Sequence, residues 1–165
     1  MVDIVAEDVD VAIRIGSMVP ESTDLVAHRL FAFRRVIVAA LSYLKRRGEP
    51  KTPAALARHA ALLHAVDAAG ETWRLVSGDR ATRVRMAVAF SSNAGHVLRA
   101  LAIEGSGVAL LPEWFIADDL ARRALRIIVP GWHSEPVAVH ALHRTVHRGE
   151  QRVRALLAHL KASYA

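Results

Sequence analysis

Three adjacent polar residues, Ser91, Ser92 and Asn93, have the side-chain types and the position to bind a small ligand. They directly precede residues 94–101, in which apolar side chains recur with the period of a helix. Their oxygens suit the N-cap of that helix. No Glu or Gln three residues later completes a capping box, so first-turn N–H groups are free to hold a small anion. The same residues equally suit an ordinary capped helix with a solvated turn, and the sequence alone favours neither interpretation.

A second group of candidate ligand contacts, Ile15, Gly16 and Ser17, ends the strand expected at residues 10–15. We expect this strand end and its loop to face residues 91–93. Small hydroxyls and free N–H groups would then converge on one small ligand, with an anion favoured. Trp114 follows another expected strand end and is the tryptophan placed where the same cleft would be, although a plain core or rim position is the alternative for any of the three tryptophans.

No motif in the sequence predicts a phosphate-binding loop or a catalytic nucleophile. The glycines at positions 105 and 107 follow a helix, whereas a P-loop or dinucleotide-binding loop has to precede one. Ser106 lacks the G-x-S-x-G frame of a nucleophile elbow. The sequence therefore predicts neither phosphoryl transfer nor serine chemistry.

The histidines and the paired aspartates do not predict a metal site or a catalytic acid. His143 and His147 have the spacing of two metal ligands on a helix, but His143 is expected to end a strand, and we expect no carboxylate nearby as a third ligand. Asp118 and Asp119 are adjacent on an expected helix, so their side chains diverge by about 100° and we expect both to be solvated. We therefore expect no catalytic residue, metal ligand or cofactor, and no enzymatic activity.

The hydrophobic pattern predicts strands that alternate with helices, which favours an α/β fold with mostly parallel sheets. Expected strands are residues 10–15, 25–33, 36–40, 62–64, 107–111, 125–129 and 137–142, and residues 72–86 are expected to form a β-hairpin. Expected helices are residues 41–48, a short helix capped by Thr52 with Pro53 at its first position, a helix closed by Gly105, one starting at residues 112–113, and residues 148–162.

Two features indicate two lobes. A basic pair at residues 34–35 separates two expected strands, and a Pro-Gly pair at residues 130–131 interrupts the chain after another strand. We place residues 36–130 in a complete lobe, and residues 1–35 with residues 131–165 in an incomplete one.

Composition excludes several classes of protein. The net charge is +6, but the arginines are spread over every segment, which indicates a solvated basic surface and not a nucleic-acid-binding patch. The absence of cysteine excludes disulfides and thiol chemistry and is compatible with a reducing cytoplasm. No apolar run approaches the roughly 20 residues that cross a bilayer, and the first residues do not form an export signal, so we expect a soluble, cytoplasmic protein without membrane contact.

A series of motifs, in order and at consistent spacing over essentially the whole chain, resembles the effector-binding domain of LysR-type transcriptional regulators. The motifs are residues 2–7 leading to DVAIRIG at 10–16, residues 25–30, residues 35–39 with Tyr43 and Leu44, TPAAL at 52–56 with His59, Asn93 with Gly95, GSGVALLP at 105–112, and residues 139–142.

The resemblance implies a two-lobed, periplasmic-binding-protein-like fold of type 2 that holds a small effector between its lobes. Effectors of this family are often small carboxylates or aromatic acids, and their binding alters how a homo-oligomer holds DNA. By position, the implied effector contacts are Ile15, Gly16 and Ser17 from the partial lobe and Ser91, Ser92 and Asn93 from the complete one.

Two departures from the family pattern bear on function. The N-terminal winged helix-turn-helix is absent, so DNA contact is expected only through a domain outside this chain. The first strand and helix of the partial lobe are also expected to be missing. The alternatives are a cytosolic solute-binding protein of the same fold, or a truncated paralogue that acts only through oligomerisation.

Overall fold

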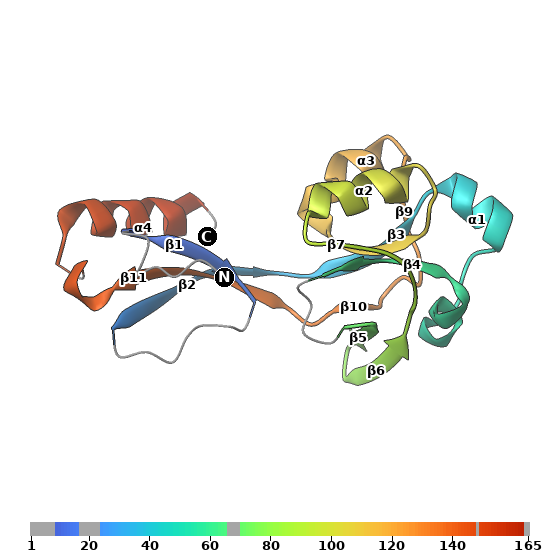
Figure 1. Cartoon of the computed structure of the whole chain (residues 1–165), viewed down its shortest axis with the longest axis horizontal. Helices are drawn as coiled ribbons and strands as arrows, with labels where there is room; N and C mark the ends of the chain where they lie inside the picture. The colour runs from blue at the N-terminus through green and yellow to red at the C-terminus, as the bar shows by residue number, and fades with distance from the viewer. Residues whose placement is uncertain (1–8, 17–23, 66–69, 148, 164–165) are drawn as a thin grey trace. The chain divides into compact units, whose positions relative to one another are not determined.

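The computed structural model describes residues 9–16, 24–65, 70–147 and 149–163. These residues form two compact units (Figure 1). Unit 1 contains residues 1–33 and 136–165, and unit 2 contains residues 34–135. The sequence placed residues 34–35 and 131–135 with unit 1. They belong to unit 2 because β10 (His133–Ser134) pairs with β3 (Arg35–Ala39) and β5 (Thr72–Ser77).

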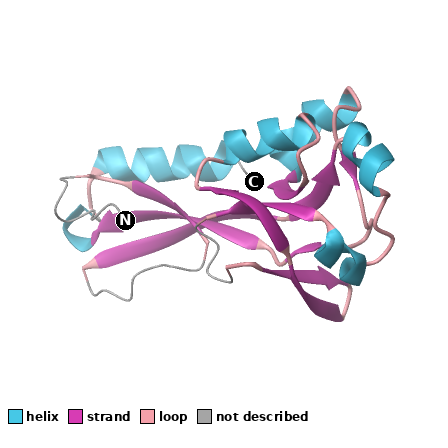
Figure 2. Cartoon of the chain, turned by 45° about the vertical axis from the view of Figure 1, so that its right-hand side comes forward, coloured by secondary structure: helices cyan, strands magenta, loops and turns pink. Residues whose placement is uncertain are grey.

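Unit 1 is a three-stranded antiparallel sheet with a helix on one face. Its strands are β1 (Ala12–Ile15), β11 (Val137–Arg144) and β2 (Leu25–Phe33), in the order β1-β11-β2. After the short 3-10 helix η3 (Thr145–His147), α4 (Gln151–Ser163) runs along these strands (Figure 2). Ala141, Val153 and Leu157 form the buried core between helix and sheet.

Unit 2 is built on an eight-stranded mixed sheet. Its described path is β6-β5-β10-β3-β8-β4-β7, and β9 (Arg126–Ile127) pairs with β3 beside this path. The remaining strands are β4 (Ala60–His64), β6 (Arg80–Arg85), β7 (Ala87–Ser92) and β8 (Val108–Pro112). The connecting helices are α1 (Leu41–Arg47), η1 (Pro53–Arg58), α2 (Gly95–Ile103), η2 (Glu113–Ile116) and α3 (Ala117–Ala121).

The central strands of unit 2 are covered on both faces. Ile37 packs with Tyr43, Leu56 and Trp73 on the side of the β5–β6 hairpin, whereas its neighbour Val38 packs with Leu98, Ile116 and other residues beneath α2 and α3. Figure 1 shows α2 and α3 on one side of β3, β4 and β7, with β5 and β6 on the other. This two-sided burial explains the continuous apolar runs that predicted the strands.

The prediction of mostly parallel sheets is wrong. Among the described strands, β4 pairs in parallel with β7 and with β8, and every other pair is antiparallel. Hydrophobic periodicity reports which faces a strand buries and not the direction of its neighbour, so this property could not be read from the pattern.

Two glycines fix the corner between α2 and β8. Gly105 has φ +75°, and its N–H and that of Ser106 bond to the carbonyls of Ala102 and Leu101, as in a helix-closing Schellman motif. A Cβ on Gly107 would lie 2.4 Å from the carbonyl oxygen of Ala60 on β4, so only glycine allows β8 to approach so closely.

No helix within the described ranges is long and apolar enough to cross a membrane.

Candidate functional site

Ser91 and Ser92 are the last residues of β7 and do not form a turn as the sequence predicted. They stay in the sheet because β7 pairs in parallel with β4, where Leu63 lies opposite Ser91 and His64 opposite Ser92. The carbonyl of Ser92 also accepts a 2.9 Å hydrogen bond from the backbone N–H of Ala65. The polar residues thus stand where two parallel strands end, the usual place for ligands in α/β sheets.

The helix that follows begins later than predicted and lacks the predicted side-chain cap. Its N-cap is Ala94, and no side chain caps it. Ser92 Oγ instead accepts a 3.1 Å hydrogen bond from the N–H of Ala94 itself. Asn93 is exposed, and within the described part of the chain its side chain makes no hydrogen bond. Neither Ser92 nor Asn93 is therefore occupied as an N-cap of α2.

The start of α2, defined as residues 91–96, is open to an anion. The backbone N–H groups of Gly95 and His96 have no acceptor among the described residues, and the first turn of α2 contains no acidic residue. The free N–H groups and the helix dipole create a positive potential at this point. The hydroxyl of Ser91 is exposed beside them and has no described partner.

The second predicted group ends β1 in unit 1. Ile15 is 65% exposed. Gly16 has φ +101°, and its N–H already donates to the carbonyl of Ala138 at 2.8 Å. Ser17 lies outside the described residues. That these residues share a ligand with residues 91–93 stays a prediction.

Trp114 is in η2 of unit 2 and is 62% exposed. Its ring meets the edge of Phe115 at a centroid distance of 5.8 Å. Phe115 in turn approaches the start of α2, since a Cβ on Gly95 would lie 3.9 Å from its Cε1. The pair therefore lies next to the open helix start, and a role for Trp114 in ligand binding stays a prediction.

Asp119 is fully buried, so the prediction that it is solvated is wrong, although Asp118 is exposed. The carboxylate of Asp119 accepts hydrogen bonds from Nε and Nη2 of Arg99 at 2.5 and 3.0 Å and from Arg122 at 2.6 Å. The Arg99 hydrogen bond is the largest cause of a lowered pKa for Asp119; burial opposes it, and Arg122 lowers the pKa further.

These three residues, the Asp119 cluster, fix α2 in place. Arg99 is on α2, Asp119 is on α3, and the Arg99 guanidinium also lies 5.5 Å from the ring centroid of Phe115. The cluster was missed from sequence because only the Asp119 and Arg122 spacing is visible there as an i, i+3 pair. The partner on α2 is 20 residues away.

His143 and His147 do not form the metal-binding pair that their spacing suggests. His143 is buried in β11, with Nδ1 2.8 Å from the carbonyl of Arg144 and Nε2 3.1 Å from Nε2 of His28. Because a carbonyl only accepts, Nδ1 of His143 carries a proton, and Nε2 of His143 shares a hydrogen bond with the His28 ring. The two rings stack with centroids 5.2 Å apart.

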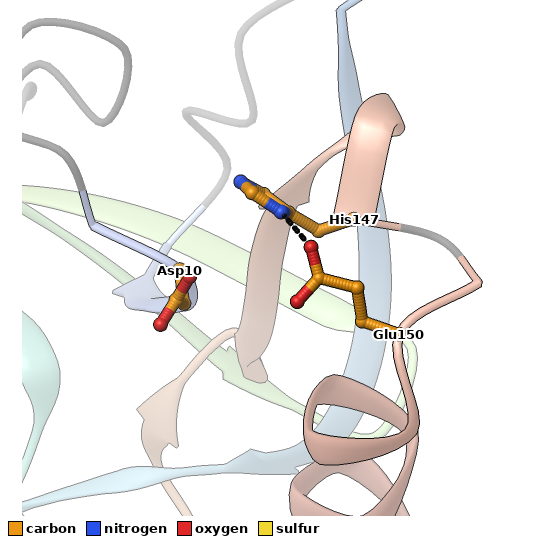
Figure 3. A group of neighbouring side chains, drawn as sticks. All are labelled: Asp10, His147 and Glu150. Atoms are coloured by element: carbon orange, nitrogen blue, oxygen red, sulfur yellow. Dashed lines mark hydrogen bonds and ion pairs between the residues drawn. The ribbon is translucent and has the colours of Figure 1, made fainter.

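His147 instead joins two carboxylates, so the expectation that none lies near it is wrong. Asp10, His147 and Glu150 have potential ligand atoms within 4.8 Å of one another (Figure 3). However, Arg152 donates to Glu150 at 2.6 Å and to Asp10 at 3.0 Å. A guanidinium bound to both carboxylates repels a metal cation, so these four residues, the Glu150 cluster, form an ion-pair network.

Comparison with known proteins places the chain in a family. The LysR substrate binding domain matches residues 1–165. The chain belongs to the LysR substrate binding domain family. This confirms the resemblance found in the sequence.

Sequence relatives of this LysR substrate binding domain are transcriptional regulators. The HTH-type transcriptional activator AaeR of Escherichia coli K12 is 31% identical over 141 residues, which cover 86% of this chain and 45% of AaeR. The HTH-type transcriptional regulator PtxR of Pseudomonas aeruginosa is 31% identical over 160 residues, covering 96% of this chain and 50% of PtxR. The chain thus spans about half the length of these relatives. Since they are regulators, the prediction that the chain is not an enzyme is confirmed.

Solved structures confirm the predicted α/β, two-lobed fold class. The regulatory domain of CrgA, a LysR-type regulator from Neisseria meningitidis, matches with a TM-score of 0.83 and 23% identity, covering 98% of this chain and 78% of that chain. Full-length AphB, a virulence activator of Vibrio cholerae, matches with a TM-score of 0.80 and 22% identity, covering 96% of this chain and 53% of that chain. At these identities the likeness concerns the fold alone.

Proposed function

We propose that this LysR substrate binding domain senses a small anionic effector, a carboxylate, at the start of α2. The effector accepts hydrogen bonds from the free N–H groups of Gly95 and His96 and from the side chains of Ser91, Ser92 and Asn93. Ile15, Gly16 and Ser17 of unit 1 and Trp114 of unit 2 complete its contacts. Occupancy is transmitted through a homo-oligomer to DNA, which a separate helix-turn-helix domain binds in the cytoplasm.

One observation supports this proposal above the others. Within the described residues, the first turn of α2 has two N–H groups without an acceptor, no side-chain cap and no acidic residue, directly beside two hydroxyls and an amide at the ends of parallel strands. A helix start without a cap loses stability unless another acceptor is supplied, and a carboxylate supplies one. The membership of the chain in the LysR substrate binding domain family supports a ligand at such a site.

The DNA-binding step rests on the relatives and not on this chain. AaeR and PtxR are named as HTH-type regulators, and this chain covers about half of each. We therefore assign DNA recognition to a domain outside residues 1–165.

A charge introduced at the helix start tests the effector site. The substitution His96→Asp places a carboxylate in the first turn of α2. This negative charge interacts favourably with the positive end of the helix dipole but repels an anionic ligand. We expect it to preserve or raise the midpoint of thermal unfolding while it weakens binding of a small carboxylate roughly fivefold or more. Binding is measured by thermal shift and calorimetry against a panel of aliphatic and aromatic carboxylates.

The matched control is His159→Asp, the same substitution at an exposed position of α4 in unit 1. The affinity of this variant for the carboxylate should stay within about twofold of that of the unsubstituted chain. If no carboxylate binds, or if both variants weaken binding equally, the proposed site is wrong. Asn93→Ala, which removes a side chain without a described partner, should weaken binding with little effect on stability.

A further inference from the structure

A cleft of unit 2 lies away from α2, between the end of α1 and the start of β4. It is open, has a volume of about 500 Å³, and is lined by residues of the segment 47–59. The side chains that define this cationic cleft are Arg47, Glu49, Lys51, Thr52, Arg58 and His59. Thr52 Oγ1 already accepts the N–H of Ala55, which fixes the turn that enters η1.

The charge balance of the cationic cleft favours an anion. Three of its side chains are cations and one, Glu49, is an anion. The carboxylate of Glu49 is already neutralised, because Lys51 lies 3.3 Å from one of its oxygens and Arg126 lies 3.3 Å from the other. Arg47 and Arg58 are exposed at the cleft and have no ion pair within the described residues. Two guanidinium groups are therefore available to a ligand.

His59 supplies a fixed hydrogen-bond donor to the same cleft. It is only 7% exposed, and its Nδ1 lies 3.2 Å from the hydroxyl of Tyr43. That hydroxyl also accepts the N–H of Ala60 at 3.0 Å, and its own proton is available to Nδ1 of His59. In the tautomer that accepts this proton, the imidazole N–H is on Nε2, which has no acceptor among the described residues. Burial, and next the charge of Arg47, lower the pKa of His59, which favours the neutral ring.

These donors match a phosphoryl group better than an aromatic acid. Two guanidiniums and an N–H approach from separate residues, and a tetrahedral phosphate presents three acceptor oxygens to such a set. The cleft offers few apolar side chains, whereas a pocket for an aromatic body is lined mostly by them. We propose that the cationic cleft binds the phosphoryl group of a small phosphate monoester or of inorganic phosphate, as a second ligand site distinct from the start of α2.

Calorimetric titration of the full chain tests this second site with three probes: glycerol 3-phosphate, inorganic phosphate and benzoate. Saturable binding of a phosphate probe is expected, with a shift of the His59 imidazole nitrogen signals in NMR spectra and no such shift with benzoate. Arg47→Gln and Arg58→Gln should each weaken phosphate binding about tenfold, because each removes a charge-assisted contact. Arg154→Gln, at an exposed arginine of α4 without a described ion pair, is the matched control and should stay within about twofold.

The source of the phosphoryl group follows from the ratio of the two phosphate affinities. Equal affinities indicate inorganic phosphate, and tighter glycerol 3-phosphate binding indicates an ester. The proposal is overturned if neither probe shifts the His59 signals, or if Arg154→Gln weakens binding as much as the cleft variants. His96→Asp should leave the phosphate-induced shift of the His59 signals unchanged, so failure at the start of α2 and failure at the cationic cleft are distinguishable.

Discussion

The Asp119 cluster and the Glu150 cluster use the same chemical groups in opposite surroundings. In the Asp119 cluster of unit 2 the shared carboxylate has no solvent exposure, and two arginines bind it. In the Glu150 cluster of unit 1 one arginine binds two carboxylates, and the Arg152, Glu150 and Asp10 side chains are 66%, 34% and 48% exposed. Burial decides how much unfolding free energy is lost when a carboxylate loses its partner, because water cannot replace the partner of a buried group.

The two networks also differ in what they connect. The Asp119 cluster joins α3 to α2, the helix whose start we propose as the effector site. The Glu150 cluster joins Asp10, just before β1, to the start of α4 within unit 1. We therefore expect loss of the first network to affect both stability and ligand binding, and loss of the second to affect stability alone and weakly.

The largest expected effect comes from Asp119→Asn. It removes the negative charge that two arginines share while keeping the side chain's size, and the loss of charge-assisted hydrogen bonds to a carboxylate without solvent exposure costs about 2 kcal/mol of unfolding free energy. Urea unfolding of the full chain measures it. The adjacent, exposed Asp118→Asn is the control, with an expected change within about 0.5 kcal/mol. Equal losses of unfolding free energy at the two positions would show that the buried ion pairs of Asp119 do not stabilise the fold.

The difference in stability between the unsubstituted chain and Asp119→Asn should depend on pH. The folded-state pKa of Asp119 is lowered, chiefly by its hydrogen bond to Arg99. A lowered folded-state pKa means that the ionised carboxylate contributes stability above the unfolded pKa of about 3.9, and that this stability is lost as the pH falls through the folded-state pKa. The difference in unfolding free energy between the unsubstituted chain and Asp119→Asn should therefore be constant near pH 6 and shrink below about pH 4. A difference that grows on acidification would contradict the assigned direction.

A smaller, salt-sensitive effect is expected from Glu150→Gln. Hydrogen bonds from His147 and then Arg152 lower the pKa of Glu150, but its surroundings are solvated. The shift of the urea midpoint should be smaller than for Asp119→Asn, and it should decrease in about 0.5 M NaCl, since salt screens exposed charges more than buried ones. Gln151→Ala, at the next and exposed position, serves as control. A salt-independent loss as large as that of Asp119→Asn would remove the contrast between the two networks.

Local sequence patterns predicted those parts of the fold that depend on neighbouring residues. Thr52 caps η1 through the N–H of Ala55 with Pro53 at the first position, as predicted. The hairpin of β5 and β6 turns at Gly78 with φ +57°, and Gly105 closes α2 with φ +75°. In each case the conformation follows from capping or backbone chemistry within a few residues.

Features that depend on distant partners could not be predicted. Ser91 and Ser92 read as a turn, but pairing with β4 extends β7 through both residues and moves the helix start to Gly95. Asp119 read as solvated because Arg99, its main partner, is on another helix. The donor role of His59 depends on Tyr43, 16 residues earlier, so the cationic cleft also had no signal in the local pattern.

The smallest expected effect is that of a divalent metal on the Glu150 cluster. Asp10, His147 and Glu150 present a nitrogen and carboxylate oxygens close enough to suit Zn²⁺, but Arg152 already neutralises both carboxylates at 2.6 and 3.0 Å. Thermal unfolding in equimolar Zn²⁺ should therefore leave the midpoint of the unsubstituted chain unchanged, because a bound ion would have to displace a guanidinium from two charge-assisted hydrogen bonds. Arg152→Gln removes this competitor, and any Zn²⁺ stabilisation should appear only in that variant and disappear again when Asp10→Asn is added. Stabilisation of the unsubstituted chain that Asp10→Asn abolishes would show instead that the cluster is a metal site.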